Sequence, residues 1–268
     1  MFKFVYKNLD ISHKLGLSSY PEDEYSKHVH YHYELVFVCN GCLEYTIDGD
    51  THLLKEGNIV LVHPGQIHFA DVRNENNYER YVLKFSESIL PSFLNEKLSN
   101  LGSFFNGTSK YSIVFKNFDD YFKNFDSDEE KYTLFICDII KLCISLSNET
   151  SFSKNFKHAF IKEVLNYIDD HICEDITLNT LSKVFLFSKS YISTEFKKYM
   201  RTTIMKYIRI KKIIYAHKLI LNGEKKSDAA RIIGFNEYST FYRCYSQIIG
   251  KSTTENYDTL APKLDLGD

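Results

Sequence analysis

Apolar residues between about positions 25 and 85 recur with a period close to two, in short runs that end at turn signals. The runs are separated by Asn40-Gly41, Asp48-Gly49-Asp50, Glu56-Gly57-Asn58 and Pro64-Gly65, and such pairings of glycine with polar residues or proline are typical of tight turns. The five runs are Leu35–Val38, Leu43–Ile47, His52–Leu54, Ile59–Val62 and Tyr81–Phe85. Many short strands joined by close turns predict a β-barrel or a sandwich.

A helical period replaces this pattern from about residue 127. Apolar side chains recur there at steps of three and four, which places them on one face of a helix: Tyr132, Phe135, Ile136, Ile139, Cys143 and Leu146. That face must be buried, either on the chain's own barrel or against a second copy of the chain.

Residues 148–157, with the sequence NETSFSKNFK, lack apolar periodicity, and we predict the domain linker there. The expected domains are therefore residues 1–150 and residues 158–262. Helical signals fill the second domain, with Thr177 and Ser188 as N-cap residues and Gly234 as a helix end. We also expect a strongly amphipathic helix at Ile204–Leu221 and a short helix around 229–233. In the other helices, the residues expected to face inward are Ile161, Val164, Leu165 and Ile168, then Leu178, Leu181 and Val184, then Ile192, Phe196 and Tyr199, and finally Phe241 and Tyr245.

Two of these segments are copies of one unit. An offset of 49 residues superimposes Ile192 on Phe241 and Phe196 on Tyr245. In a helix-turn-helix unit the second helix turns apolar residues inward and polar residues toward the major groove of DNA. We therefore predict DNA-facing side chains at Lys189, Ser190, Ser193, Thr194, Lys197 and Lys198, and at Tyr238, Ser239, Tyr242 and Arg243. The helix between the two units would be about 27 Å long, close to the ~34 Å between successive major grooves.

The charge of the chain is distributed unevenly between these two parts. Residues 1–154 hold 15 Lys and Arg against 22 Asp and Glu, whereas residues 155–262 hold 17 against 11. The first part is therefore unsuited to binding a polyanion, and the second part is suited to it.

Residues 160–257 resemble the C-terminal domain of AraC/XylS-type regulators. The matching segments are ITLNTLSKVFLFSKSYISTEFKKY and AARIIGFNEYSTFYRCYSQIIGKS, with Gly234-Phe235 and a closing glycine at Gly250. The resemblance implies base-facing positions at Ser190, Ser193 and Thr194, and at Tyr238, Ser239, Tyr242 and Arg243. Only Arg243 among them has the fork geometry for a bidentate contact with guanine. Phosphate contacts would come from Lys189, Lys197, Lys198, Lys225 and Lys251.

The chain departs from the family pattern at three positions. Arg201 stands where a glycine is expected to close the first unit, and a positive φ costs a non-glycine residue about 1 kcal/mol, so that turn would be built differently. Lys226 occupies a position that is usually apolar, and Thr253 stands where the family has a proline.

His28, His30, His32 and Glu34 alternate with apolar or aromatic residues, so a single strand would place all four on one face. The pattern His-x-His-x-x-x-Glu, formed by His28, His30 and Glu34, resembles the first metal-binding motif of cupins, and Pro64 with His68 resembles the start of the second. Against a metal, the glycine expected before His28 is absent, and His68 follows Pro64 by four residues where the cupin pattern has five.

Sensor domains of AraC-type regulators resemble cupins and often keep such histidines in an effector pocket. We assign His28, His30, His32, Glu34 and His68 to effector binding, with a metal site and structural hydrogen bonding as the alternatives.

Six cysteines in a chain of this length are too sparse for a disulfide framework, and Cys39 and Cys42 are better explained as small apolar residues flanking a hairpin than as half a zinc site. The first residues do not resemble a targeting segment, and no apolar run approaches the ~20 residues of a membrane span. We therefore expect a cytoplasmic protein.

These observations predict an α+β chain of two domains. The first would be a cupin-like β-barrel with following helices, and the second an all-α domain with two helix-turn-helix units. The chain would be a sequence-specific regulator of transcription that responds to a small-molecule effector, with promoter DNA as its partner and no catalytic residues, metal or cofactor. The family resemblance adds a homodimer and a contact with RNA polymerase. The rival interpretations are a cupin-type metal-binding protein or metalloenzyme, and a metal-responsive regulator.

Overall fold

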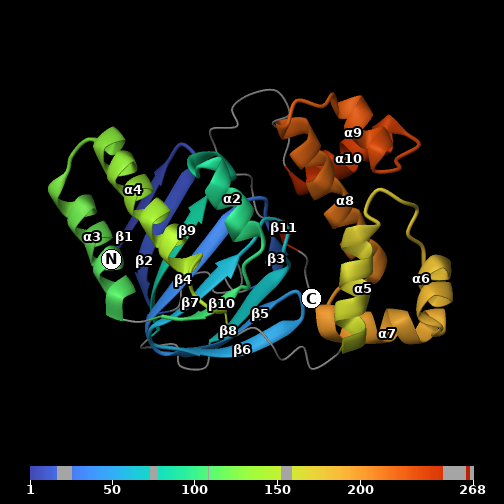
Figure 1. Ribbon diagram of the computed structural model, residues 1–268, viewed down its shortest axis with the longest axis horizontal. Helices are drawn as coiled ribbons and strands as arrows, with labels where there is room; N and C mark the ends of the chain where they lie inside the picture. Colours follow the sequence, from blue (N-terminus) through green and yellow to red (C-terminus); the bar gives the residue numbers. More distant parts are fainter. Residues whose placement is uncertain (17–25, 73–77, 108, 152–158, 250–263, 266–268) are drawn as a thin grey trace. The chain divides into compact units, whose positions relative to one another are not determined.

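A computed structural model of the protein describes residues 1–16, 26–72, 78–107, 109–151, 159–249 and 264–265. They fall into two compact units, the first mainly Met1–Ser26 and Tyr31–Lys154, the second mainly Lys27–His30 and Asn155–Glu255. The first is rich in strands and the second is built from helices, which confirms the predicted fold class (Figure 1). The exact domain boundaries stay a prediction, because most of the expected linker lies outside the described residues. Among the described residues, no helix combines the length and the apolarity that crossing a membrane requires.

The strands form two open sheets, which is the form that the predicted barrel takes. The six-stranded sheet has the order β1-β2-β9-β4-β7-β10, and the five-stranded sheet has the order β11-β3-β8-β5-β6. The strands are β1 (Phe2–Tyr6), β2 (Leu9–Leu15), β3 (His28–Val29), β4 (Tyr33–Asn40), β5 (Cys42–Ile47), β6 (Asp50–Lys55), β7 (Asn58–Val62), β8 (His68–Val72), β9 (Glu79–Phe85), β10 (Phe104–Asn106) and β11 (Leu264–Asp265). All five predicted runs lie inside strands.

The central strand β4 is buried on both of its faces. Leu35 and Phe37 belong to a core shared with helices, whereas Val36 and Val38 belong to a second core shared with residues of β5 and β6. Alternate residues of a strand point to opposite faces, so Glu34 shares the face of Val36 and Val38. Its carboxylate therefore faces the second sheet rather than the helices.

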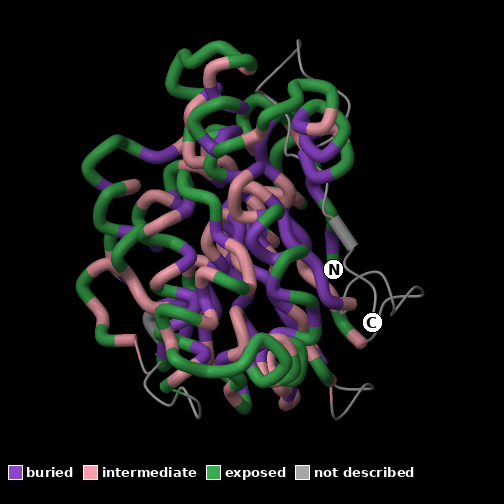
Figure 2. Tube along the Cα trace, turned by 90° about the vertical axis from the view of Figure 1, so that its right-hand side faces the viewer, coloured by how far each residue is buried: buried purple, intermediate pink, exposed green. Residues whose placement is uncertain are grey.

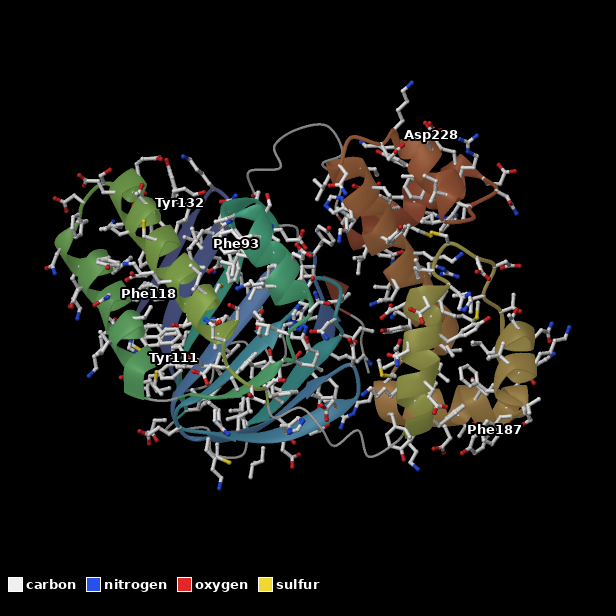
Figure 3. The ribbon with its side chains drawn as sticks, in the orientation of Figure 1. Phe93, Tyr111, Phe118, Tyr132, Phe187 and Asp228 are labelled. Carbon is white, nitrogen blue, oxygen red and sulfur yellow. The ribbon has the colours of Figure 1, made fainter. Side chains whose placement is uncertain are left out.

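Helices α2 (Ser92–Ser99), α3 (Ser109–Asn124) and α4 (Asp128–Leu146) follow the strands, after a short 3-10 helix at Glu87–Ile89. Phe115 of α3 stacks on Phe37 with ring centroids 4.3 Å apart, and Phe118 lies edge-on to Phe135 of α4 at 5.3 Å. Figure 3 marks Phe118 and Tyr111 along α3. The apolar stripe of α4 thus packs on the chain's own sheet, which answers the question that its periodicity left open.

Asp138 joins the two long helices of this layer. Its carboxylate accepts hydrogen bonds from Asn117 Nδ2 at 3.1 Å and from Tyr121 Oη at 2.8 Å, both on α3, and pairs with Lys141 Nζ at 2.9 Å. Burial acts to raise the pKa of Asp138, but the hydrogen bonds from Lys141, Asn117 and Tyr121 outweigh it and hold the pKa below its ordinary value. The ionised carboxylate therefore ties α3 to α4.

The second unit contains six helices within the described residues. They are α5 (Ala159–Asp170), α6 (Leu178–Phe185), α7 (Lys189–Met200), α8 (Ile204–Leu221), α9 (Lys226–Ile232) and α10 (Tyr238–Ile248). Helix α8 connects the pair α6 and α7 to the pair α9 and α10 (Figure 1). Along the chain trace, buried segments alternate with exposed ones (Figure 2).

Three details of the predicted faces are wrong. Val184 is exposed, because α6 ends one residue later and turns its last apolar side chain outward. On α7 Met200 is buried while Tyr199 is only half-buried, since Met200 continues the four-residue spacing of Ile192 and Phe196. Helix α8 is not strongly amphipathic, because residues on most of its sides are buried against both flanking helix pairs.

Candidate nucleic-acid interface and effector site

The first candidate DNA-binding helix, α7, is capped and anchored as a recognition helix must be. The Ser188 side chain accepts a hydrogen bond from the Tyr191 backbone N–H at 3.2 Å, and Ile192 and Phe196 are fully buried. The preceding helix α6 is capped in the same way, by Thr177 on the Thr180 N–H at 3.1 Å. This geometry fixes which side of α7 faces solvent.

The predicted DNA-facing residues of α7 lie on that solvent side. Lys189, Ser190, Thr194, Lys197 and Lys198 are exposed, and Ser193 is half-buried. Lys198 also lies 3.8 Å from Glu195 Oε1 and over the Tyr199 ring. The structure thus brings the hydroxyl and ammonium groups of α7 onto one accessible surface, while their contact with DNA stays a prediction.

Both turns that flank α7 use a left-handed residue other than glycine. Leu186 before the helix has φ 57° and Arg201 after it has φ 50°. The expectation that the Arg201 turn is built differently is therefore wrong: the turn keeps the left-handed geometry and accepts the strain of a side chain, which costs about 1 kcal/mol.

The second candidate DNA-binding helix, α10, repeats this arrangement without a side-chain cap. Phe241 and Tyr245 are buried, whereas Tyr238, Ser239, Tyr242 and Arg243 are exposed, as predicted. Gly234 adopts φ 80° in the turn after α9 and Lys212 Nζ donates to the adjacent Ile233 carbonyl at 2.8 Å, which ties this turn to α8. Lys226, where the family pattern is apolar, is half-buried at the first residue of α9.

His217 on α8 holds α10 through a buried polar contact. Its Nδ1 lies 2.6 Å from Tyr245 Oη, and burial lowers the pKa of His217 to about 4. The ring is therefore neutral at physiological pH. Sequence periodicity missed this pair, because a histidine within an apolar helix face gives no signal of its partner.

The predicted effector residues do not lie on one strand. The chain forms β3 at His28–Val29, bends at Tyr31 and His32, and begins β4 at Tyr33, so the alternation expected across His28 to Glu34 is broken. All five residues assigned to effector binding are buried. His32 lies in the bend between the two strands, and the assignment of all five residues to an effector stays a prediction.

Glu34 and His68 approach each other from the two sheets. Glu34 Oε2 lies 3.9 Å from His68 Nε2 and 3.5 Å from Lys84 Nζ, while Tyr45 Oη donates to Glu34 Oε1 at 3.2 Å. Burial and the neighbouring Glu34 raise the pKa of Tyr45 well above its ordinary value. The sequence pattern gave no signal for Lys84 or Tyr45, since only strand pairing brings Lys84 opposite Glu34.

The tautomer of His68 follows from its second contact. His68 Nδ1 lies 3.0 Å from the Gln66 carbonyl oxygen, which only accepts, so Nδ1 carries a proton. In the neutral ring, Nε2 is then an acceptor, and it faces a second acceptor, the carboxylate of Glu34. A cation or a proton between the two groups would stabilise this arrangement.

Four buried residues carry side chains that can ligate a metal ion: His28, His30, Glu34 and His68. His28 and His30 have ring centroids 5.7 Å apart. Three imidazoles and one carboxylate suit zinc, iron or manganese. The residues thus fit such an ion, and equally fit a polar effector.

Cys39 and Cys42 are both free thiols that flank the Gly41 turn, which has φ 95°. Burial raises the pKa of Cys39 to about 12, so the free thiol is protonated at neutral pH.

Comparison with known proteins places this geometry in a family. Residues 15–138 match the family model of the AraC-like ligand binding domain. This match and the relatives named next make the chain similar to AraC-type regulators. The regulator is 24% identical over 256 residues to the uncharacterized HTH-type transcriptional regulator YdiP of Escherichia coli (strain K12), covering 90% of this chain and 84% of that protein. It is 24% identical over 243 residues to the uncharacterized HTH-type transcriptional regulator YdeC of Bacillus subtilis (strain 168), covering 82% of each.

Solved structures give a weaker likeness. The regulator matches the AraC-like transcriptional activator CuxR with a TM-score of 0.44 and 12% identity, over 86% of this chain and 83% of that one. ToxT from Vibrio cholerae O395 matches with a TM-score of 0.38 and 12% identity, over 89% and 93%. The family assignment depends on the domain match and the sequence relatives.

Proposed function

We propose that the regulator binds operator DNA through α7 and α10 and responds to a small molecule bound by its N-terminal domain. One observation carries the proposal: α8 joins two helix pairs, and the second helix of each pair, α7 or α10, has a buried apolar face and an exposed polar face. The match of residues 15–138 to a ligand-binding domain supports the sensor role.

Most of the affinity would come from phosphate contacts. Lys189, Lys197 and Lys198 on α7 and Lys225 at the start of α9 are exposed and available for them, and Lys251 lies outside the described residues. Affinity that depends on phosphate contacts falls steeply with salt, because counterions are released on binding. Base preference would depend most on Arg243, whose guanidinium fits guanine bidentately.

A selected-duplex experiment tests this assignment. Duplexes selected by the full chain are titrated with the wild type, Arg243→Ala and the matched control Arg231→Ala, an exposed arginine on α9 that pairs with Asp228 at 3.1 Å. We expect Arg243→Ala to relax preference at one base pair by ~1–3 kcal/mol, and Arg231→Ala to leave preference unchanged. Unchanged base preference in Arg243→Ala would contradict the assignment.

The effector site would use His28, His30, His32, Glu34 and His68. Buried imidazole and carboxylate groups favour a small polar ligand that offers both donors and acceptors. A thermal-shift screen of sugars and metabolites on the full chain should find a stabilising compound whose effect is lost in Glu34→Gln. A compound that still stabilises Glu34→Gln by the same amount would place the effector elsewhere.

A metal-responsive regulator is the second candidate, favoured by the proton on His68 Nδ1 and by the ligand chemistry of buried His28, His30, Glu34 and His68. Elemental analysis of purified protein should then show near-stoichiometric zinc, iron or manganese that is lost in His30→Ala and kept in His171→Ala, a half-buried histidine that pairs with Glu174. A metal-free wild type that still binds DNA and an organic effector would eliminate this candidate.

The proposal includes a homodimer and a contact with RNA polymerase, both implied by the family. It includes no catalytic step, since the relatives that span most of the chain are named as transcriptional regulators. A cytoplasmic location remains part of the proposal.

A further inference from the structure

Four exposed apolar side chains surround the turn before α7. Val184, Leu186, Phe187 and Tyr191, which we call the turn patch, are 45%, 88%, 42% and 44% exposed. Figure 3 marks Phe187 at this end of the second unit. A contiguous apolar surface on a protein indicates a binding site, whereas scattered single residues do not.

Phe160 of α5 packs against the aromatic residues of the turn patch. Phe187 and Tyr191 lie with ring centroids 4.8 Å apart, and Phe160 of α5 contacts both rings, at 4.9 Å and 5.8 Å. Phe160 also lies edge-on to Phe185 at 5.7 Å. These contacts join Phe187 and Tyr191 into one ordered aromatic surface, and Leu186 and Val184 precede Phe187 by one and three residues.

Leu186 contributes little to the stability of its own unit. Its φ of 57° strains a residue that has a Cβ, and its side chain is almost fully exposed. Glycine would adopt this turn without strain, so the leucine side chain is explained better by a partner than by folding.

The surroundings of the turn patch identify a polyanion as that partner. The patch borders Thr194, an exposed hydroxyl residue of α7, because Tyr191 lies three residues before it on the helix. No acidic residue occurs from Leu178 to Thr194, whereas Lys183 and Lys189 both occur there and are exposed; Glu195, the next residue, lies 3.8 Å from Lys198 Nζ. Apolar groups between lysines at the start of a recognition helix fit the major groove of DNA.

The major groove offers one apolar group, the 5-methyl of thymine. The hydroxyls of Ser190, Ser193 and Thr194 are short and accept or donate to several bases, so they discriminate little. We infer that the turn patch reads thymine methyl groups, with Leu186 and Tyr191 as specificity-determining residues of the first helix-turn-helix unit. This inference rests on the proposed function, since it requires that α7 bind DNA.

The test removes methyl groups from the DNA rather than from the protein. Duplexes selected by the full chain are remade with each thymine replaced in turn by uracil, which lacks only the 5-methyl group, and binding is measured by fluorescence anisotropy. We expect one or two positions at which binding weakens about fourfold, which is the effect of one buried methyl group at ~0.8 kcal/mol. In Leu186→Gly that sensitivity should fall to less than twofold.

The control is Leu221→Ala, which shortens an exposed leucine outside the turn patch and should keep the full uracil sensitivity. Binding that tolerates uracil at every position would overturn the inference, as would an equal uracil sensitivity in Leu186→Gly. The inference would also be overturned if Leu186→Gly kept its uracil sensitivity but changed its oligomeric state in analytical ultracentrifugation. That result would assign the turn patch to contact with a second copy of the chain. A wild type that selects no duplex at all contradicts the proposed function itself, which separates the two failures.

Discussion

Acidification should destabilise the second unit through His217. The ring is buried between α8 and α10, with Nδ1 2.6 Å from Tyr245 Oη, and burial lowers its pKa to about 4. In the unfolded chain the pKa returns to about 6.5. Above pH 6.5 both states hold a neutral ring and the stability is unaffected. As the pH falls from 6.5 toward 4, the unfolded chain binds a proton that the folded unit excludes, so stability is lost.

The expected loss follows from the difference between the two pKa values. Each unit of pKa difference corresponds to about 1.4 kcal/mol, so the full effect approaches ~3 kcal/mol and about 2 kcal/mol is already lost between pH 8 and pH 5. Below pH 4 the folded ring also takes up a proton, and the loss due to this residue stops increasing.

Urea denaturation of the full chain at pH 8 and pH 5 measures this difference, with hydrogen exchange of α8 and α10 amides to assign it to the second unit. His217→Gln keeps a polar partner for Tyr245 but does not titrate, so its stability should lose about 2 kcal/mol less than that of the wild type. Tyr245→Phe is the control, because it deletes the hydrogen bond and keeps the titrating ring. Equal pH dependence in the wild type and in His217→Gln would refute the reasoning.

Three further substitutions test the packing and capping of the structure. Phe196→Ala deletes a fully buried ring of α7 and should lower the free energy of unfolding by about 3–5 kcal/mol in urea, unless the site collapses. Ser188→Ala removes the cap of α7 and should cost about 1 kcal/mol, whereas Ser193→Ala on the same helix should cost less; an equal cost would argue against the cap. Asp138→Asn should lower the free energy of unfolding by about 1–3 kcal/mol at pH 7, measured by thermal or urea unfolding. This difference from the wild type should shrink as the pH falls through the lowered pKa of Asp138, because the wild type then loses the same charge. A difference that is constant with pH would count against the ionised contact.

The sequence predicted most of the second unit because its helices carry strong local signals. Ser188 and Thr177 cap helices where N-cap chemistry indicated, and Ile192 with Phe196 forms the inward face of α7. These features depend on residues at most four apart, which periodicity detects.

Some elements of the first unit were missed although their signals were present. The run Phe2–Tyr6 alternates buried Phe2 and Phe4 with exposed Lys3 and Val5, which is the pattern of a half-buried strand. In α3, aromatic residues recur at Tyr111, Phe115, Phe118 and Phe122, at helical spacing. Neither pattern entered the prediction.

The arrangement around Glu34 depends on pairings that no local pattern contains. Lys84 lies opposite Glu34 through the register of β4 and β9, and His68 reaches it from the other sheet. The bend at His32 breaks the alternation that would have placed a fourth group with them. Long-range strand register therefore decides the composition of the candidate site, and the sequence could only nominate its members.

Hydroxyl-radical footprinting of the full chain on a selected duplex would show whether α7 and α10 both contact DNA. We expect two protected segments on one face of the duplex, about 10 base pairs apart, because α7 and α10 would occupy successive major grooves. Arg243→Ala should weaken one of the two protections and leave the other. A single protected segment that Arg243→Ala does not alter, or no protection at low salt, would contradict this expectation.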